Sequence, residues 1–138
     1  MRGLCRNYEA QVTHLFTGYI NSLLQQHAAD PRNGWKAKDA AIFIVIALTV
    51  RGGNAKLGAT QTNQAVNLLD FFGTHVLPEL QAAAAALTGG GASAHPVLIA
   101  DALKFVTVFR SQLPADAYSQ ALPAVVTLLG HTQIVVHT

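Results

Sequence analysis

The chain has 138 residues, of which 51% are hydrophobic and only 12% charged, and its net charge is +2 at pH 7. This length and composition predict one domain-sized segment with enough apolar side chains for a substantial core. The Lys and Arg residues are scattered and form no basic run, which argues against nucleic-acid binding. The longest apolar run, 40–50, is shorter than the ~18 residues of a spanning helix, so no membrane insertion is expected.

The N-terminal residues and the cysteine content bear on the compartment. Cys5 is the only cysteine, so the sequence offers neither an internal disulfide nor a cysteine-based zinc site. Arg2 and Arg6 are followed by no continuous apolar stretch and no small-residue cleavage site, which argues against a secretory signal. We therefore expect a reducing compartment, the cytosol or the nucleus.

The first two predicted elements are helices. Apolar side chains recur every three or four residues from about 7 to 28, which predicts an amphipathic helix. Asp30-Pro31 and Asn33-Gly34 are two successive turn signals that should end this helix and reverse the chain. A second helix is predicted over 35–50. Its β-branched run would also suit a buried strand, but the flanking alanines favour a helix.

A polar insertion separates the second helix from the third. Residues 51–62 contain three glycines and few apolar side chains, which predicts an insertion loop. The Thr-rich end of this segment suits capping of the next helix. That helix is predicted over 63–87, with Gly73 and Pro78 as the expected sites of a bend.

The remaining segments are a linker and two more helices. Residues 88–95 are rich in glycine and alanine and lack a periodic apolar face, which predicts a flexible linker. His95-Pro96 then opens a fourth helix over 96–112. Pro114 opens a fifth over 114–129, in which Pro123 should introduce a kink.

The order of these helices repeats along the chain. Leu-Pro pairs at 77–78 and 122–123 both lie in the second helix of an antiparallel pair, and their offset matches the ~40–47 residues of HEAT or armadillo repeats. We therefore predict an all-α fold over 1–138, a HEAT-repeat superhelix of about two repeats plus flanking helices. Residues 133–137, with Ile134, Val135 and Val136 at their centre, begin a further apolar segment without a cap, which we interpret as a sign of a longer solenoid.

Residues that could carry chemistry are better explained by packing. No two of the six histidines are spaced i, i+4, and none belongs to an H-E-x-x-H motif. Asp39 and Asp101 each have a lysine three residues away, which favours intrahelical ion pairs, and Asp70 also falls in an apolar helix. We therefore expect no enzyme, no catalytic residue, no metal and no cofactor. Aromatic residues at helical spacing are more often core than ligand pocket, the place expected of Phe71, Phe72, Phe105 and Phe109.

Five segments, in order and spacing, resemble the karyopherin-β family of nuclear export receptors. The resemblance implies a parent protein that binds importin-α together with Ran in its GTP form and returns importin-α to the cytoplasm. It also implies contact with nuclear pore proteins and a location in both nucleus and cytoplasm. The matching segments are 12–24 (VTHLFTGYINSLL), 35–47 (WKAKDAAIFIVIA), 63–80 (NQAVNLLDFFGTHVLPEL), 96–114 (PVLIADALKFVTVFRSQLP) and 134–138 (IVVHT).

The same resemblance points to a site. The family has an insertion between the two helices of a central repeat, which approaches Ran and the cargo, and residues 51–62 occupy the matching place. The candidate protein-binding residues that follow from it are Arg51, Asn54, Lys56 and Thr60.

Two other functions stay open on the sequence. One is a HEAT-repeat scaffold that joins proteins unrelated to nuclear transport. The other is a small helical enzyme, which requires a pocket that gathers two or more of the histidines or aspartates.

Overall fold

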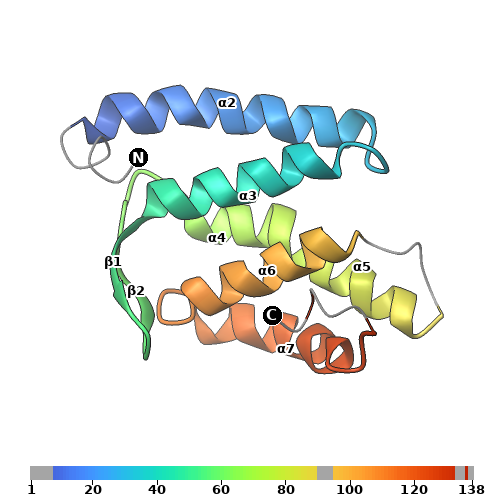
Figure 1. Ribbon diagram of the computed structural model, residues 1–138. Coiled ribbons are helices and arrows are strands. Elements are labelled where there is room, and N and C mark those ends of the chain that lie inside the picture. The colour runs from blue at the N-terminus through green and yellow to red at the C-terminus, as the bar shows by residue number, and fades with distance from the viewer. Residues whose placement is uncertain (1–7, 90–94, 133–135, 137–138) are drawn as a thin grey trace. The chain divides into compact units, whose positions relative to one another are not determined.

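The computed structural model describes residues 8–89, 95–132 and 136. The chain divides into two compact units, Met1–Asn67 and Leu68–Thr138. Regular structure in the described residues is helical apart from one two-stranded hairpin (Figure 1), which confirms the predicted all-α class. Cys5, most of the predicted linker (90–94) and most of the last matching segment (134–135 and 137–138) lie outside the described residues.

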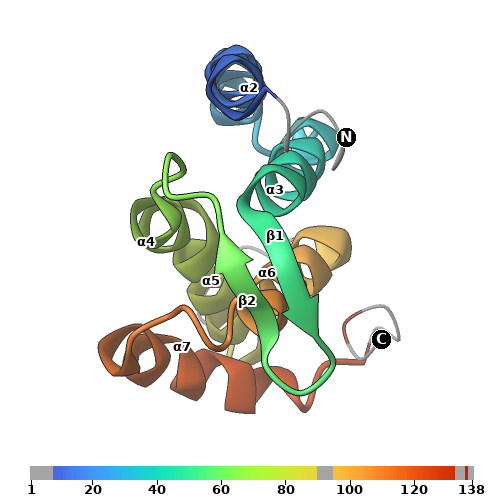
Figure 2. The same ribbon diagram turned by 90° about the vertical axis from the view of Figure 1, so that its left-hand side faces the viewer.

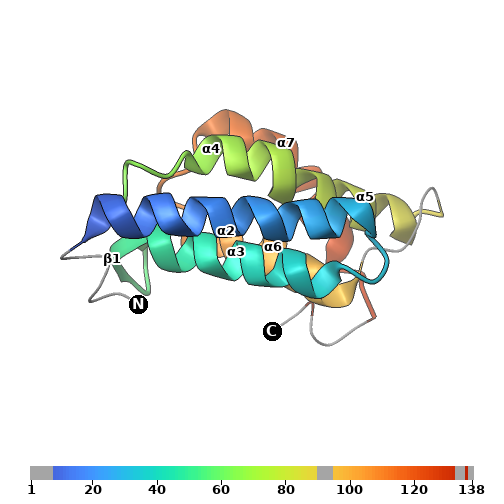
Figure 3. The same ribbon diagram turned by 90° about the horizontal axis from the view of Figure 1, so that it is seen from above.

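The first unit is built on an antiparallel helix pair. Helices α2 (Glu9–Ala29) and α3 (Trp35–Thr49) run side by side (Figure 3), close to the predicted ranges of 7–28 and 35–50. The turn between them is tight, because a Cβ on Gly34 would lie 2.7 Å from the carbonyl oxygen of Asp30. The buried apolar side chains of this pair are Ile20, Leu23, Ala41, Ile42, Ile44, Val45 and Leu48.

The predicted loop over 51–62 is wrong in conformation, because this segment forms a β-hairpin (Figure 2). Strand β1 (Val50–Asn54) pairs antiparallel with β2 (Gly58–Thr62). Gly58 has φ of 75° and closes a three-residue connection, a conformation that glycine adopts at low cost. A Cβ on Gly53 would collide with the carbonyl oxygen of Gly58. Glycines that suggested a loop are thus the residues that allow the two strands to meet.

The predicted third helix begins later than expected and contains an irregular turn. Residues 63–67 form a turn, and the helix consists of α4 (Leu68–Phe71), the π-helical turn η1 (Phe72–Val76) and α5 (Leu77–Leu87). The backbone N–H of Leu77 donates to the carbonyl of Phe72, five residues back. Gly73 lies inside this turn and Pro78, which has no N–H to donate, follows it. The irregular turn therefore falls where the sequence predicts a bend.

Two further helices complete the second unit. Helices α6 (Pro96–Val108) and α7 (Ala115–Leu128) both pack against α5. The Nδ1 atom of His95 accepts from the N–H of Val97 at 3.3 Å and so caps α6, which ends four residues before its predicted end at 112. Phe105 and Phe109 are fully buried, with ring centroids 4.7 Å apart. The prediction that Phe71, Phe72, Phe105 and Phe109 belong to the core is confirmed.

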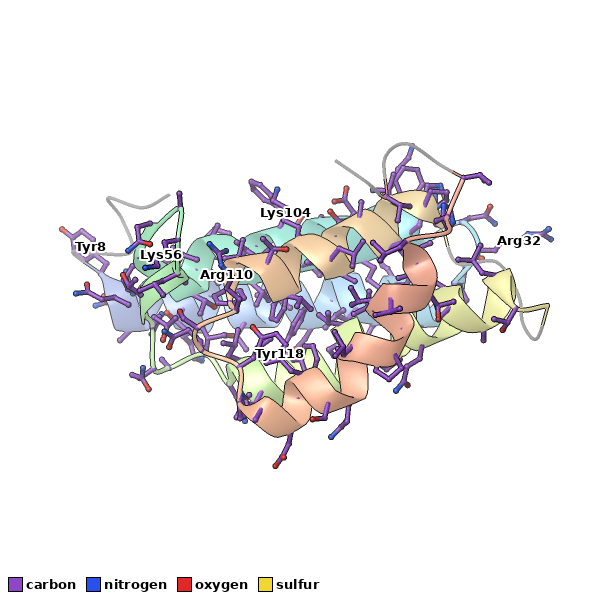
Figure 4. The ribbon with its side chains drawn as sticks, turned by 90° about the horizontal axis from the view of Figure 1, so that it is seen from below. Tyr8, Arg32, Lys56, Lys104, Arg110 and Tyr118 are labelled. Atoms are coloured by element: carbon purple, nitrogen blue, oxygen red, sulfur yellow. The ribbon has the colours of Figure 1, made fainter. Side chains whose placement is uncertain are left out.

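The connection from α6 to α7 is held by a tyrosine. The hydroxyl of Tyr118, near the start of α7, donates to the carbonyl of Arg110 just beyond the end of α6 (Figure 4). Burial raises the pKa of Tyr118 above its usual value, so the hydroxyl stays protonated and donates at neutral pH.

None of the described helices combines the length and the apolar character that crossing a lipid bilayer requires.

Candidate protein-binding site

The four residues predicted as contacts all lie on the hairpin, but their structural roles differ. Lys56 is exposed in the turn at the tip (Figure 4), while Asn54, also exposed, shapes that turn. The Oδ1 atom of Asn54 accepts from the backbone N–H of Lys56 at 3.0 Å and of Leu57 at 2.8 Å. An asparagine that satisfies two backbone donors in this way fixes the turn conformation.

Arg51 and Thr60 occupy the two irregular positions of the strand pairing. Gly53 pairs with Ala59 and Gly52 pairs with Gln61, so Thr60 of β2 has no partner residue in β1. The next pair is Val50 with Thr62, so Arg51 of β1 likewise has no partner residue in β2. Bulges of this kind increase the local twist and redirect side chains. Thr60 is exposed and Arg51 is half-buried. Arg51 therefore lies at a bulge on the side of the hairpin with its Nη2 atom buried, whereas Lys56 is exposed at the tip.

The hairpin is a locally basic element. Between Asp39 and Asp70 the only charged residues are Arg51 and Lys56. The nearest carboxylates in the sequence on either side are Asp39 and Asp70 themselves. Charge complementarity favours an acidic partner surface.

Leu57 at the tip was missed by the sequence analysis. Its side chain is 47% exposed beside Lys56, so the tip offers an apolar group as well as a cation. The signal was present, because Asn54 and Gly58 are four residues apart and bracket three others. That spacing is typical of a three-residue hairpin connection closed by a glycine in the left-handed region.

Asn63 at the base of the hairpin was also missed. Its side chain is 3% exposed, and its Nδ2 atom donates to Oγ1 of Thr13 at 2.9 Å. The backbone N–H of Asn63 donates to the carbonyl of Thr49 at 2.8 Å. No local sequence signal identifies this residue, since its partner on α2 lies 50 positions earlier.

In the part of the chain that the structure describes, no three His, Cys, Asp or Glu side chains gather closely enough to hold a metal ion. The three aspartates considered above come from three different helices, α3, α4 and α6.

Comparison with known proteins gives the family. The family model Cse1 matches residues 1–138. Exportin-2 of Oreochromis niloticus is 44% identical and that of Homo sapiens 41% identical, each over the whole of this chain and 14% of the relative. A solved structure, the exportin Cse1 in its cargo-free, cytoplasmic state, matches 99% of this chain and 14% of that chain with a TM-score of 0.86 and 29% identity.

The chain thus spans 14% of the length of the curated relatives that it matches. The structural likeness confirms the predicted HEAT-repeat fold class, and the named relatives confirm the resemblance to nuclear export receptors. The chain belongs to the Cse1 family of exportins.

Proposed function

We propose that this chain is the part of a nuclear export receptor that presents a basic β-hairpin to importin-α bound together with Ran-GTP. The observation that carries the proposal is an exposed hairpin tip with Lys56 and Leu57, set between helices of a chain from an exportin family. The role is non-catalytic. It requires the parent protein to move between nucleus and cytoplasm past nuclear pore proteins, and a relative in a cargo-free, cytoplasmic state fits such a cycle.

The tip is suited to binding because it is already shaped. Asn54 closes the turn through two hydrogen bonds, and Gly58 holds the left-handed conformation that ends it. A preorganised loop loses less conformational freedom when a partner binds. Its chemistry is complementary to an acidic surface around a shallow apolar depression, which would receive Leu57 while carboxylates face Lys56.

Two apolar helix faces support a place inside a longer repeat array. Leu15 is 70% exposed on α2 and Leu129 is 72% exposed just after α7. In repeat proteins such faces are covered by neighbouring repeats. The other exposed apolar residues on or next to these two helices are Tyr8, Tyr19, Leu122 and Val126.

Charge reversal at the tip tests the proposal. A full-length receptor of the family is made to carry this chain in place of its own matching segment, and its affinity for importin-α is measured with and without Ran-GTP. Lys56→Glu should weaken binding about tenfold at low salt, because an attraction becomes a repulsion. The loss should shrink as added salt screens the charges.

The matched control is Arg32→Glu, the same reversal in the exposed turn between α2 and α3. That turn lies at the other end of α3, whose 15 residues span ~22 Å. Arg32→Glu should leave the affinity within about twofold of the unmodified receptor. If the two variants bind importin-α with equal affinity, the hairpin tip is not part of the interface.

A further inference from the structure

The hairpin is anchored by one buried residue at its base. Every polar group of Asn63 has a partner: its backbone N–H donates to Thr49, its carbonyl accepts from Val66, and its Oδ1 accepts from Ala65 at 2.9 Å. The Nδ2 atom donates to Oγ1 of Thr13 at 2.9 Å and to the carbonyl of Leu48 at 3.5 Å. A fully satisfied buried amide has one allowed orientation, since any rotation breaks bonds that water cannot replace.

These bonds join three parts of the first unit. Thr13 belongs to α2 and is 6% exposed, whereas Leu48 and Thr49 form the last turn of α3. Asn63 directly follows β2. One side chain therefore ties the exit of the hairpin to both helices of the pair.

The junction depends on Asn63 rather than on its polar neighbour. The hydroxyl of Thr49 is buried and has no hydrogen-bond partner among the described residues, so Thr49 contributes only its backbone. Thr13 has a second local contact, because its carbonyl accepts from the hydroxyl of Thr17 one turn further along α2, at 2.7 Å. Thr17 thus offers a hydroxyl on the same helix whose hydrogen bond stays within α2.

We propose that Asn63 is a positioning residue, which through Thr13 fixes the direction of the hairpin relative to the α2–α3 pair. The packing of the two helices and the position of the tip then depend on each other, and any partner bound at the tip is coupled to the same junction. The positioning itself rests on the hydrogen bonds above. Only its effect on partner binding rests on the proposed function.

Amide hydrogen exchange of this chain tests the positioning without a partner. Thr13→Val keeps the shape of the side chain and removes the oxygen that Asn63 bonds. It should speed exchange of the β1 and β2 amides about tenfold while the central α2 amides keep their rates. Thr13→Ser restores the hydroxyl and should restore most of the protection. Thr17→Val is the matched control and should change neither set.

Two outcomes would overturn the positioning role. One is unchanged hairpin exchange in Thr13→Val. The other is an equal acceleration of hairpin and α2 amides, which indicates general loss of stability. Asn63→Ala should speed exchange of the hairpin amides more than Thr13→Val does. If Asn63→Ala does not fold, the threonine variants alone test the positioning role.

Partner binding separates this inference from the proposed function. In the receptor carrying this chain, Thr13→Val should weaken binding of importin-α with Ran-GTP about threefold to tenfold, and Thr17→Val should not. If Lys56→Glu weakens binding and Thr13→Val does not, the hairpin binds but the junction does not position it. If Lys56→Glu has no effect, the proposed function fails, and hydrogen exchange still decides the role of Asn63.

Discussion

The hairpin Val50–Thr62 and the π-helical turn Phe72–Val76 are two interruptions of an otherwise helical chain, and they are stabilised in opposite ways. The hairpin is polar, projects from the end of α3 (Figure 2), and depends on turn hydrogen bonds and one buried amide. The π turn buries the apolar side chains of Phe72 and Val76, and Phe72 packs on Phe105 with ring centroids 6.5 Å apart. The π turn contributes Phe72 and Val76 to the core, whereas the hairpin buries Ala59 but keeps its tip exposed and so accessible to a partner.

The largest predicted effect on stability comes from removing the aromatic core that supports the π turn. Phe105 is fully buried and contacts the rings of Phe71, Phe72 and Phe109. Phe105→Ala should lower the free energy of unfolding by about 3–5 kcal/mol, since it removes a large apolar side chain and leaves a cavity. Urea denaturation followed by circular dichroism measures the loss.

Leu122→Ala is the control for that measurement. Leu122 is 58% exposed on α7, and its truncation should change stability by at most about 0.5 kcal/mol. Similar losses for the two variants would contradict the view that an aromatic core supports the π turn.

The next prediction breaks the hairpin alone. Gly53→Ala places a Cβ against the carbonyl of Gly58, and a close-packed backbone gives way at a cost of about 1–3 kcal/mol. Gly52→Ala is its matched control, because a Cβ there meets nothing nearer than 3.5 Å. Hairpin amides should exchange faster in Gly53→Ala than in Gly52→Ala, while α2 and α3 stay folded. Equal exchange in both variants would show that the strands do not need this close approach.

The helices were predictable because their signals are local. Apolar residues at three- and four-residue spacing marked α2, and His95-Pro96 marked the start of α6, which the structure places at Pro96. Boundaries were less accurate where tertiary contacts decide them. Asn63 was assigned to a helix, yet its side chain bonds α2 and holds residues 63–67 in a turn.

The hairpin was not predicted because glycine can have two opposite effects on strands. Gly52, Gly53 and Gly58 weaken a strand in general, but here Gly53 permits close strand approach and Gly58 takes a left-handed conformation. The resemblance suggested the position of the site, which stays a prediction, and Lys56 is exposed at that position. The roles of Asn54 and Asn63 depend on hydrogen bonds that a sequence does not show.

Two helical glycines test whether the π turn differs from a regular helix in its need for glycine. Gly18 lies in regular α2 and Gly73 in the π turn, and a Cβ on either meets nothing within 4 Å. Gly18→Ala should raise the free energy of unfolding by about 0.5–1 kcal/mol, because alanine loses less backbone freedom on folding. If Gly73→Ala raises the free energy of unfolding by as much as Gly18→Ala, the conformation of the π turn does not require glycine. A smaller gain in matched urea melts would measure how far the turn relies on it.

The smallest effect concerns a second asparagine turn, between α2 and α3. The side-chain amide of Asn33 donates to Oδ2 of Asp30 at 2.8 Å and its backbone N–H donates to Oδ1 at 3.2 Å. The side-chain bond, followed by the backbone bond, lowers the pKa of Asp30 below its usual value. Because the folded pKa is the lower one, the stabilisation is present above the unfolded pKa and is lost as pH falls through the folded pKa.

Asn33→Ala should therefore raise the pKa of Asp30 toward its usual value without fully restoring it, since the backbone bond remains. NMR titration of the Asp30 carboxyl measures this shift, and Asn21→Ala, an exposed change on α2, should leave it unaltered. The difference in stability between the chain and Asn33→Ala should be greatest near neutral pH and should shrink in acid. It should remain small throughout, because water solvates this exposed carboxylate when its partner is removed. An asparagine in a solvated turn then contributes little, while Asn63, buried at the base of the hairpin, has no such substitute for its lost bonds.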